Sequence, residues 1–352
     1  MKILYVALKY NYGQPSQGNT YEHYNFYHAL VHMGHDILYF DMMLMQHERE
    51  SMNQRLLEVA KREKPDLMFT VLHTNELEQS VVREISENSD TVTLNWFCDD
   101  QWRFDNYSRY WAPCYNWVIT TAPGALPKYA HLGYRGVIKS QWAYNHFLYR
   151  KLDLPLKYDV TFVGQPHGNR REIIQSLRDA GINVHVWGHG WESGRLSQEG
   201  MIRVFNQSRI NLNLSKASTS DRSTHDDQNP EQIKGRSFEI PGCGGFQLSG
   251  SAEDLDNYYD IGKEIVCFEG VDDLKEKACY YLSNEDERAA IAQAGYQRTL
   301  REHTYAHRFA SIFKRLGLPS KPLHEILKGD VHLGRTMELS KQLDRQRNKY
   351  QF

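Results

Sequence analysis

The sequence predicts an α/β protein built from two similar halves, each a parallel sheet covered by helices. Continuous apolar runs of strand length alternate with segments of helix length from the first residues onward. Several of these runs end in glycine-containing or polar loops, as in right-handed βαβ units. The alternation restarts after about residue 157, and 352 residues suffice for two halves with separate cores.

The first half contains a complete set of alternating elements. KILYVAL at 2–8 is a buried strand, and the polar loop that follows it contains Gly13 and Gly18. A helix is expected from Thr20 to about Met33, where Gly34 ends it. Further strands are expected at 35–40, 66–72, 91–97, 117–120 and from 136, with helices at 46–63 and 75–87. These segments define a Rossmann-like domain over residues 1–151.

The second half repeats the pattern. Strands are expected at 158–164, 183–188, 210–214 and 265–268, with another starting at Phe246 and a helix at 169–180. The short segment 152–157 is interpreted as a hinge, and 158–316 as a second Rossmann-like domain. The polar tail 317–352 is expected either to return to the first domain or to fray. The two domains would face each other across a cleft.

Composition excludes several classes of protein. The net charge is −2 and no long basic run occurs, which argues against a protein held mainly by nucleic-acid phosphates. The five cysteines form no CxxC pair, so neither a zinc site nor a disulfide framework is predicted. The N-terminus lacks signal-peptide features, and no apolar run approaches the ~20 residues that span a bilayer. We therefore expect a cytoplasmic protein whose membrane contact, if any, is peripheral.

The segment 231–248, EQIKGRSFEIPGCGGFQL, carries the clearest chemical signal. Two glutamates, Glu231 and Glu239, flank the cations Lys234 and Arg236, and a turn with Gly244 and Gly245 follows. A carboxylate can accept hydrogen bonds from vicinal ribose hydroxyls, cations can face a diphosphate, and glycines let backbone N–H groups approach an anion. The alternative is an amphipathic helix with solvated charges and an ordinary glycine stop.

This segment resembles the donor-binding motif of retaining glycosyltransferases with the two-domain GT-B fold. Their pattern is a glutamate, seven residues, a second glutamate, and then small residues and glycine. The sequence RSFEIP at 236–241 resembles CgeB-like (spore maturation type) glycosyltransferases even more closely, as do YYLSN at 280–284 and HTYAHR at 303–308. The strong match covers about residues 230–313, and the Gly-Phe-Gly that usually follows the first glutamate in the wider superfamily is absent.

The resemblance implies a set of roles for donor binding. Glu239 would hold the ribose, Lys234 and Arg236 would stabilise the departing diphosphate, and Glu231 would contact the transferred sugar. Gln165 follows Gly164 where the family often has arginine, so the positive charge must come from other residues. Beside Lys234 and Arg236, the candidates for that charge are Lys216, Arg170 and Arg171.

Residues at the carboxyl ends of the predicted strands complete the candidate site, because ligands of open α/β sheets bind there. Gly13 and Gly18 would lie near the diphosphate, and Gly164 and His189 would line the donor half. His73 follows the third strand, and Asp99 with Asp100 ends the fourth, placed to orient an acceptor hydroxyl or act as a base. A metal site at Asp99 and Asp100 is the alternative reading.

We expect a glycosyltransferase that moves a sugar from a nucleotide-diphosphate donor to an acceptor bound by the first domain. The resemblance implies retention of configuration, no metal and no other cofactor. A nucleotide-sugar epimerase of the same fold and a non-catalytic nucleotide- or glycan-binding subunit are the alternatives. The acceptor stays open among a glycan, a protein, a small molecule and modified nucleic acid. The sequence leaves the oligomeric state, the sugar and the base open too.

Overall fold

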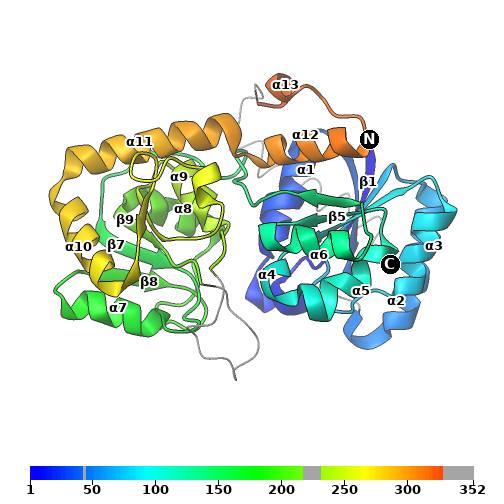
Figure 1. The fold of residues 1–352 in the computed structure, drawn as a ribbon, viewed down its shortest axis with the longest axis horizontal. Helices are drawn as coiled ribbons and strands as arrows, with labels where there is room; N and C mark the ends of the chain where they lie inside the picture. Colours follow the sequence, from blue (N-terminus) through cyan, green and yellow to red (C-terminus); the bar gives the residue numbers. More distant parts are fainter. Residues whose placement is uncertain (43–44, 217–230, 328–352) are drawn as a thin grey trace.

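The computed structural model describes residues 1–42, 45–216 and 231–327. It has two bodies side by side, each a parallel sheet with helices packed against it (Figure 1). Residues 2–139 supply the strands of the first sheet, and residues 158–268 supply those of the second. The predicted tail 317–352 lies inside the described residues only as far as residue 327.

The first sheet has six strands in the order β2-β1-β3-β4-β5-β6, and every pair is parallel. The strands are β1 (Lys2–Ala7), β2 (Asp36–Asp41), β3 (Leu67–Thr70), β4 (Val92–Phe97), β5 (Trp117–Thr120) and β6 (Val137–Lys139). The helices are α1 (His28–His32), α2 (Met45–Glu63), α3 (Gln79–Asn88), α4 (Asp100–Arg103), α5 (Arg109–Trp111) and α6 (Leu126–His131). A π-helical turn, η3 (His23–Tyr27), precedes α1 directly. The expected helix from Thr20 to Met33 therefore contains one wide turn.

Side-chain alternation along β1 explains why this sheet is buried on two faces. Ile3 and Tyr5 belong to one apolar cluster and Leu4 and Val6 to another, because successive side chains of a strand point to opposite faces. All four side chains are at most 1% exposed. The continuous apolar run at the N-terminus is thus the mark of a central strand between two helical layers.

The second sheet has five parallel strands in the order β11-β10-β9-β7-β8. The strands are β7 (Tyr158–Val163), β8 (Val184–Trp187), β9 (Ser208–Asn213), β10 (Gln247–Gly250) and β11 (Val266–Phe268). The helices are α7 (Arg170–Asp179), α8 (Gln198–Gln207), α9 (Arg236–Gly242), α10 (Gly270–Ser283) and α11 (Glu285–Glu302). The predicted class, two Rossmann-like halves, is confirmed.

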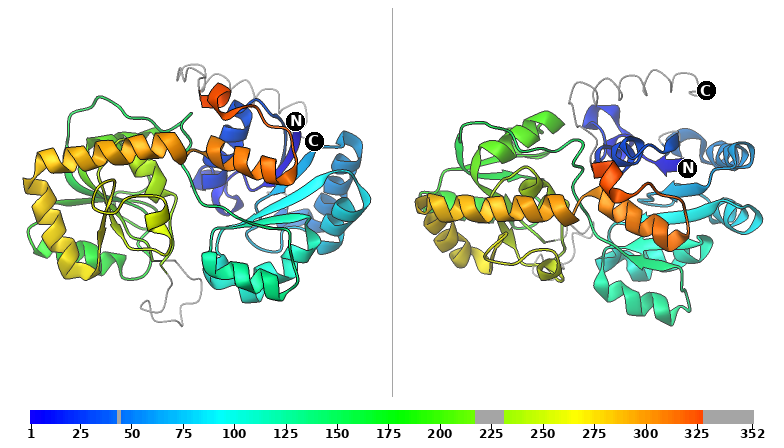
Figure 2. Two further views of the ribbon diagram at one scale, coloured as in Figure 1. Left: turned by 45° about the horizontal axis from the view of Figure 1, so that its top comes forward. Right: turned by 90° about the horizontal axis from the view of Figure 1, so that it is seen from above.

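The last described helices return the chain to the first body. α11 lies along the second body, and α12 (Tyr305–Leu316) lies against the first, followed by α13 (Leu323–Leu327) (Figure 2). The Thr304 hydroxyl caps α12 by accepting the N–H of His307. Phe309 and Phe313 of α12 are fully buried in the apolar cluster that contains Phe26.

The two chain segments that join the bodies are hydrogen-bonded to each other. Tyr144 N–H donates to His303 O at 3.1 Å, and Tyr305 N–H donates to Tyr144 O at 3.1 Å. The predicted hinge, 152–157, is bonded at its ends to α8: Leu152 N–H donates to Asn206 and Lys157 N–H to Gln207. Relative motion of the bodies must therefore bend paired segments near Tyr144 and Thr304.

Gly188 follows β8, and its substitution tests how the second body is packed. Its φ is 148°, and a Cβ there would lie 2.1 Å from Gly164 O. We predict that Gly188→Ala lowers the free energy of unfolding by about 3 kcal/mol, through backbone strain and this clash. Gly181→Ala is the matched control, because Gly181 has φ 81° but open space around it, and should cost about 1–2 kcal/mol. Calorimetric melting that gives equal losses would contradict the packing argument.

Candidate functional site

The carboxyl ends of the two sheets face each other across the interface between the bodies. The loop after β1 meets the loop after β8, where Arg195 donates to the backbone oxygens of Gln17 and, at 3.4 Å, Asn19. Elsewhere Lys139 of β6 forms an ion pair with Asp254 at 3.1 Å. In open α/β sheets this edge is where ligands bind. We call this interface, marked by the Arg195–Gln17 and Lys139–Asp254 contacts, the seam, and several of the predicted strand-end residues lie at it.

Lys234 is the centre of a group of cations at this seam. Burial, with a smaller contribution from Arg170, lowers the pKa of Lys234 to about 7, and Asp99 of the opposite body opposes this shift. Burial also lowers the pKa of His167, with Arg170 and Lys234 contributing. Within the described part of the chain, the Lys234 ammonium forms no hydrogen bond or ion pair. Such a half-buried cation beside other cations calls for an anion.

Arg170 holds the strand ends together at this site. Its guanidinium donates to Gln165 O at 2.9 Å, Leu214 O at 3.0 Å and Lys216 O at 3.3 Å. Burial lowers its pKa to about 10, so it stays charged at neutral pH. Arg170 is the first residue of α7, where backbone N–H groups also favour an anion. Of the candidate cations, Arg170 and Lys234 therefore lie together at this site.

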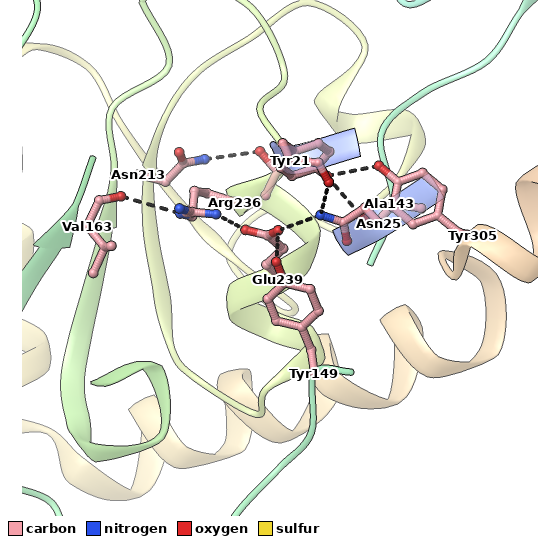
Figure 3. Close-up of polar contacts among 10 residues, drawn as sticks. Tyr21, Asn25, Ala143, Tyr149, Val163, Asn213, Arg236, Glu239 and Tyr305 are labelled. Atoms are coloured by element: carbon pink, nitrogen blue, oxygen red, sulfur yellow. Dashed lines mark hydrogen bonds and ion pairs between the residues drawn. The ribbon is translucent and has the colours of Figure 1, made fainter. Parts of the chain in front are cut away.

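Glu239 is fully buried, and its carboxylate is already hydrogen-bonded (Figure 3). Arg236 forms an ion pair with Oε2, and the Tyr149 hydroxyl donates to Oε1. Asn25 Nδ2 of the first body also donates to Oε1, at 3.4 Å. The ribose contact expected for Glu239 stays a prediction, and it requires exchange of at least one of these partners.

Arg236 is committed to Glu239 and to the end of β7. Its Nε donates to Val163 O at 3.3 Å, and its Nη1 contacts the carboxylate (Figure 3). Burial alone would lower the pKa of Arg236, but Glu239, together with Tyr149 and Tyr21, offsets this and the pKa is raised. Stabilising a diphosphate, the role predicted for Arg236, would therefore compete with pairing to Glu239.

The adjacent Asp99 and Asp100 point in different directions. Tyr129 OH donates to Asp100 Oδ2 at 2.8 Å inside the first body, and burial raises the pKa of Asp100. Asp100 is 2% exposed, whereas Asp99 is partly exposed and acts on the charge of Lys234. The geometry thus assigns Asp99 to the seam and Asp100 to the interior, where it packs α4 against α6.

The glycine loop after β1 lies at the seam in a well-defined shape. Asn11 Nδ2 donates to the oxygens of Gln17, Gly18 and Asn19, at 2.7 to 3.2 Å. Gly13 and Gly18 each have φ 68°, a conformation that glycine adopts without strain. A Cβ on Gly18 would lie 3.8 Å from Arg195 Nη1, so this loop is in contact with the second body.

Glu231 and Lys216 flank the part of the chain between 216 and 231. They form an isolated antiparallel bridge, and the oxygen of Lys216 accepts a bond from Arg170. Burial raises the pKa of Glu231, with Lys216 opposing the shift. Glu231 and Lys216 are therefore held near the cations, on the donor side of the seam.

The remaining predicted residues differ in how near they lie to Lys234 and the other cations. Gly164 ends β7 beside Gly188, and the exposed His189 follows β8. His73 follows β3 and is partly exposed, with no contact among the described residues that ties it to Lys234. Gly244 and Gly245 lie before β10, at the amino edge of the sheet, where a Cβ would meet Lys151 and Phe205 O. The structure therefore does not bring Gly244 and Gly245 to the cation cluster.

Three site residues gave no signal in the sequence. Asn25 and Tyr149 reach Glu239 from 214 and 90 positions away, and His167 lies beside the cations in the loop after β7. Only the loop position of His167, just after a predicted strand, could have indicated it. The contact from Asn25 depends on how the two bodies are placed, and the contact from Tyr149 depends on the path of the segment that joins them.

Neither a cluster of metal ligands nor a membrane-spanning helix occurs among the described residues. No group of three or more His, Cys, Asp or Glu side chains is arranged there to hold a metal ion. No helix of the described ranges combines the length and hydrophobicity needed to cross a membrane.

Comparison with known proteins supports the family expected from the sequence. Residues 169–314 match a family model described as glycosyl transferase-like. Spore protein CgeB of Bacillus subtilis (strain 168) is 26% identical over 213 residues, covering 53% of this chain and 64% of that protein. The match thus spans less than two thirds of this curated relative's length.

Solved structures of the same architecture cover nearly the whole chain. Anabaena HepE, determined in complex with UDP and glucose, aligns with a TM-score of 0.64 at 11% identity over 90% of this chain and 99% of its own. Sucrose-phosphate synthase from Thermosynechococcus elongatus gives 0.60 at 9% identity, over 90% and 98%. The chain has the GT-B fold, and its resemblance to CgeB-like proteins is confirmed.

Removing Arg236 tests whether Glu239 is a buried charge that needs its partner. We predict that Arg236→Met lowers the free energy of unfolding by about 3 kcal/mol, because an uncompensated carboxylate would stay buried. The double variant Arg236→Met/Glu239→Gln should lose clearly less, since it carries no buried charge. Calorimetry would measure both, and a single variant as stable as the wild type would contradict this reading.

Proposed function

We propose that this protein is a GT-B glycosyltransferase that uses a nucleotide-diphosphate sugar as donor. The observation that carries the proposal is the Lys234 ammonium, which lies at the seam beside Arg170 and His167 without a paired anion among the described residues. A diphosphate supplies that anion, and burial strengthens the attraction. The similarity to a protein whose structure contains UDP and glucose supports this choice of ligand.

The donor would bind mainly to the second body. Its diphosphate would contact Lys234 and the first turn of α7, with Arg170 holding the strand ends around it. Its ribose would reach Glu239, and Glu231 with Lys216 would lie near the transferred sugar. Gly13 and Gly18 let the loop after β1 close over the donor without side chains in the way.

Transfer itself needs little chemistry from the protein besides orientation and charge. The acceptor oxygen forms a bond to the anomeric carbon while the bond from that carbon to the diphosphate oxygen breaks. The leaving diphosphate takes the bonding electrons and the hydroxyl proton, and Lys234 stabilises its charge. Asp99 would orient the acceptor hydroxyl from the first body. We infer retention of configuration and independence of metal from the family resemblance.

A ligand panel tests the function most simply. Purified protein is mixed with nucleoside diphosphates and nucleotide sugars, UDP-glucose first, with EDTA or with Mg²⁺, and its melting is followed. A ligand at a hundred times its Kd should add about 2.7 kcal/mol of stability. Products then separate transfer to an acceptor from isomerisation of the donor or binding without turnover. No stabilisation by any nucleotide would refute the proposed function.

Lys234 predicts how nucleotide affinity depends on pH. A diphosphate favours the charged amine, so binding raises a pKa that is about 7 in the unliganded protein. Affinity should therefore fall as pH rises from 7 to 9, by up to about tenfold per unit, with proton uptake on binding near pH 7. Arg170, His167 and Asp99 are the other ionisable groups facing this amine.

Calorimetric titration with UDP in buffers of different ionisation enthalpy measures both the affinity and the proton uptake. Lys234→Arg is the control, because a guanidinium stays charged throughout this range and should give a flat profile. If the affinity of the wild-type protein showed the same flat dependence on pH, the assignment of Lys234 to the anion site would be wrong.

Substitution of the two neighbouring aspartates, one at a time, tests the catalytic role of Asp99 with Asp100 as its control. We predict that Asp99→Asn lowers the rate of sugar transfer by about a hundredfold, because it removes the carboxylate that faces the acceptor. Asp100→Asn should stay within about threefold of the wild type, since that side chain bonds Tyr129 inside the first body. Label transferred from a radioactive nucleotide sugar to a panel of saccharides measures both, and the reverse order of effects would rule out the assignment.

A further inference from the structure

Asn25 links the two bodies at the carboxylate on which the proposed donor site depends. It is fully buried in the π-helical turn η3, and its Nδ2 donates to Glu239 Oε1 at 3.4 Å (Figure 3). The same Nδ2 donates to Tyr21 O at 3.2 Å, and Tyr21 packs against Gly235, where a Cβ would lie 2.5 Å from the Tyr21 hydroxyl. Turns of this kind often occur at functional sites.

The carboxylate has little capacity left for a ribose. A carboxylate oxygen accepts about two hydrogen bonds, and Oε1 already accepts from Tyr149 and Asn25. Oε2 is paired with Arg236, and the whole side chain is fully buried. Two vicinal hydroxyls therefore cannot add to this arrangement, and at least one donor on Oε1 must leave.

Asn25 is the partner that costs least to release. Its contact is the longest of the three, and its Oδ1 is buried without a hydrogen-bond partner among the described residues. Tyr149 belongs to the segment that leads into the second body, and Arg236 is in α9 itself. Losing Tyr149 or Arg236 would break contacts that Glu239 needs, whereas losing Asn25 only separates the two bodies at this point.

We propose that Asn25 is an interdomain latch on Glu239 whose place the donor ribose takes. This inference rests on the proposed function and adds that nucleotide binding and contact between the two bodies at this point exclude each other. Nucleotide binding therefore loosens η3 from α9, while Tyr149 stays and positions the carboxylate. Asn25 consequently weakens donor affinity in the wild-type protein.

Asn25→Leu tests the latch because it keeps the size of the side chain and removes the donor. The Kd for UDP should fall about three- to tenfold, because one weak hydrogen bond to Glu239 no longer competes with the ribose. Tyr149→Phe should raise the Kd instead. Tyr21→Phe is the matched control, because the Tyr21 hydroxyl contacts Tyr305 at 2.9 Å and donates to Ala143 O at 3.4 Å but does not bond Glu239, and it should leave the Kd unchanged.

Hydrogen exchange of the wild-type protein gives a second measurement that needs no variant. With saturating UDP, amides of residues 21–28 should exchange faster, while those of 236–242 should exchange more slowly. An unchanged or higher Kd in folded Asn25→Leu, or slower exchange at 21–28, would overturn the latch. Failure of UDP and every other nucleotide to bind the wild type would instead overturn the proposed function itself.

Discussion

The buried carboxylate of Glu239 ties together the elements that surround it. A fully buried charge is tolerated only with a compensating partner, and Arg236 supplies it within the same helix. Arg236 in turn bonds the end of β7, and Tyr149 and Asn25 bring the joining segment and the first body to the same carboxylate. One charge thus fixes α9, a strand end and the approach of the two bodies.

The structure also distinguishes Lys234 from Arg236, to which the sequence motif gave one shared role in binding a diphosphate. Arg236 compensates Glu239, whereas Lys234, two residues earlier, has no paired anion among the described residues and faces Asp99 across the seam. The adjacent aspartates divide in a similar way, with Asp99 at the seam and Asp100 bonded to Tyr129. In each pair, one residue maintains the structure and its neighbour is available for a ligand.

Much of the fold was predictable from the sequence because its signal is local. Apolar runs and glycine stops located all six strands of the first sheet, and the strands β7 to β11 of the second. The placement of Gly244 and Gly245 could not be judged from a motif, because it depends on which edge of the sheet the end of α9 reaches. Asn25 and Tyr149 could not be identified for a related reason, since Glu239 is distant from both in sequence, and for Asn25 it also lies across the interface between the bodies.

A crystal structure of the protein with a bound nucleoside diphosphate tests the central claim most directly. The account predicts the diphosphate within hydrogen-bonding distance of the Lys234 ammonium and the first turn of α7, with the ribose hydroxyls on Glu239. A nucleotide bound elsewhere, such as in the acidic cavity of about 800 Å³ lined by Glu253, Asp254 and Asp273, would contradict it.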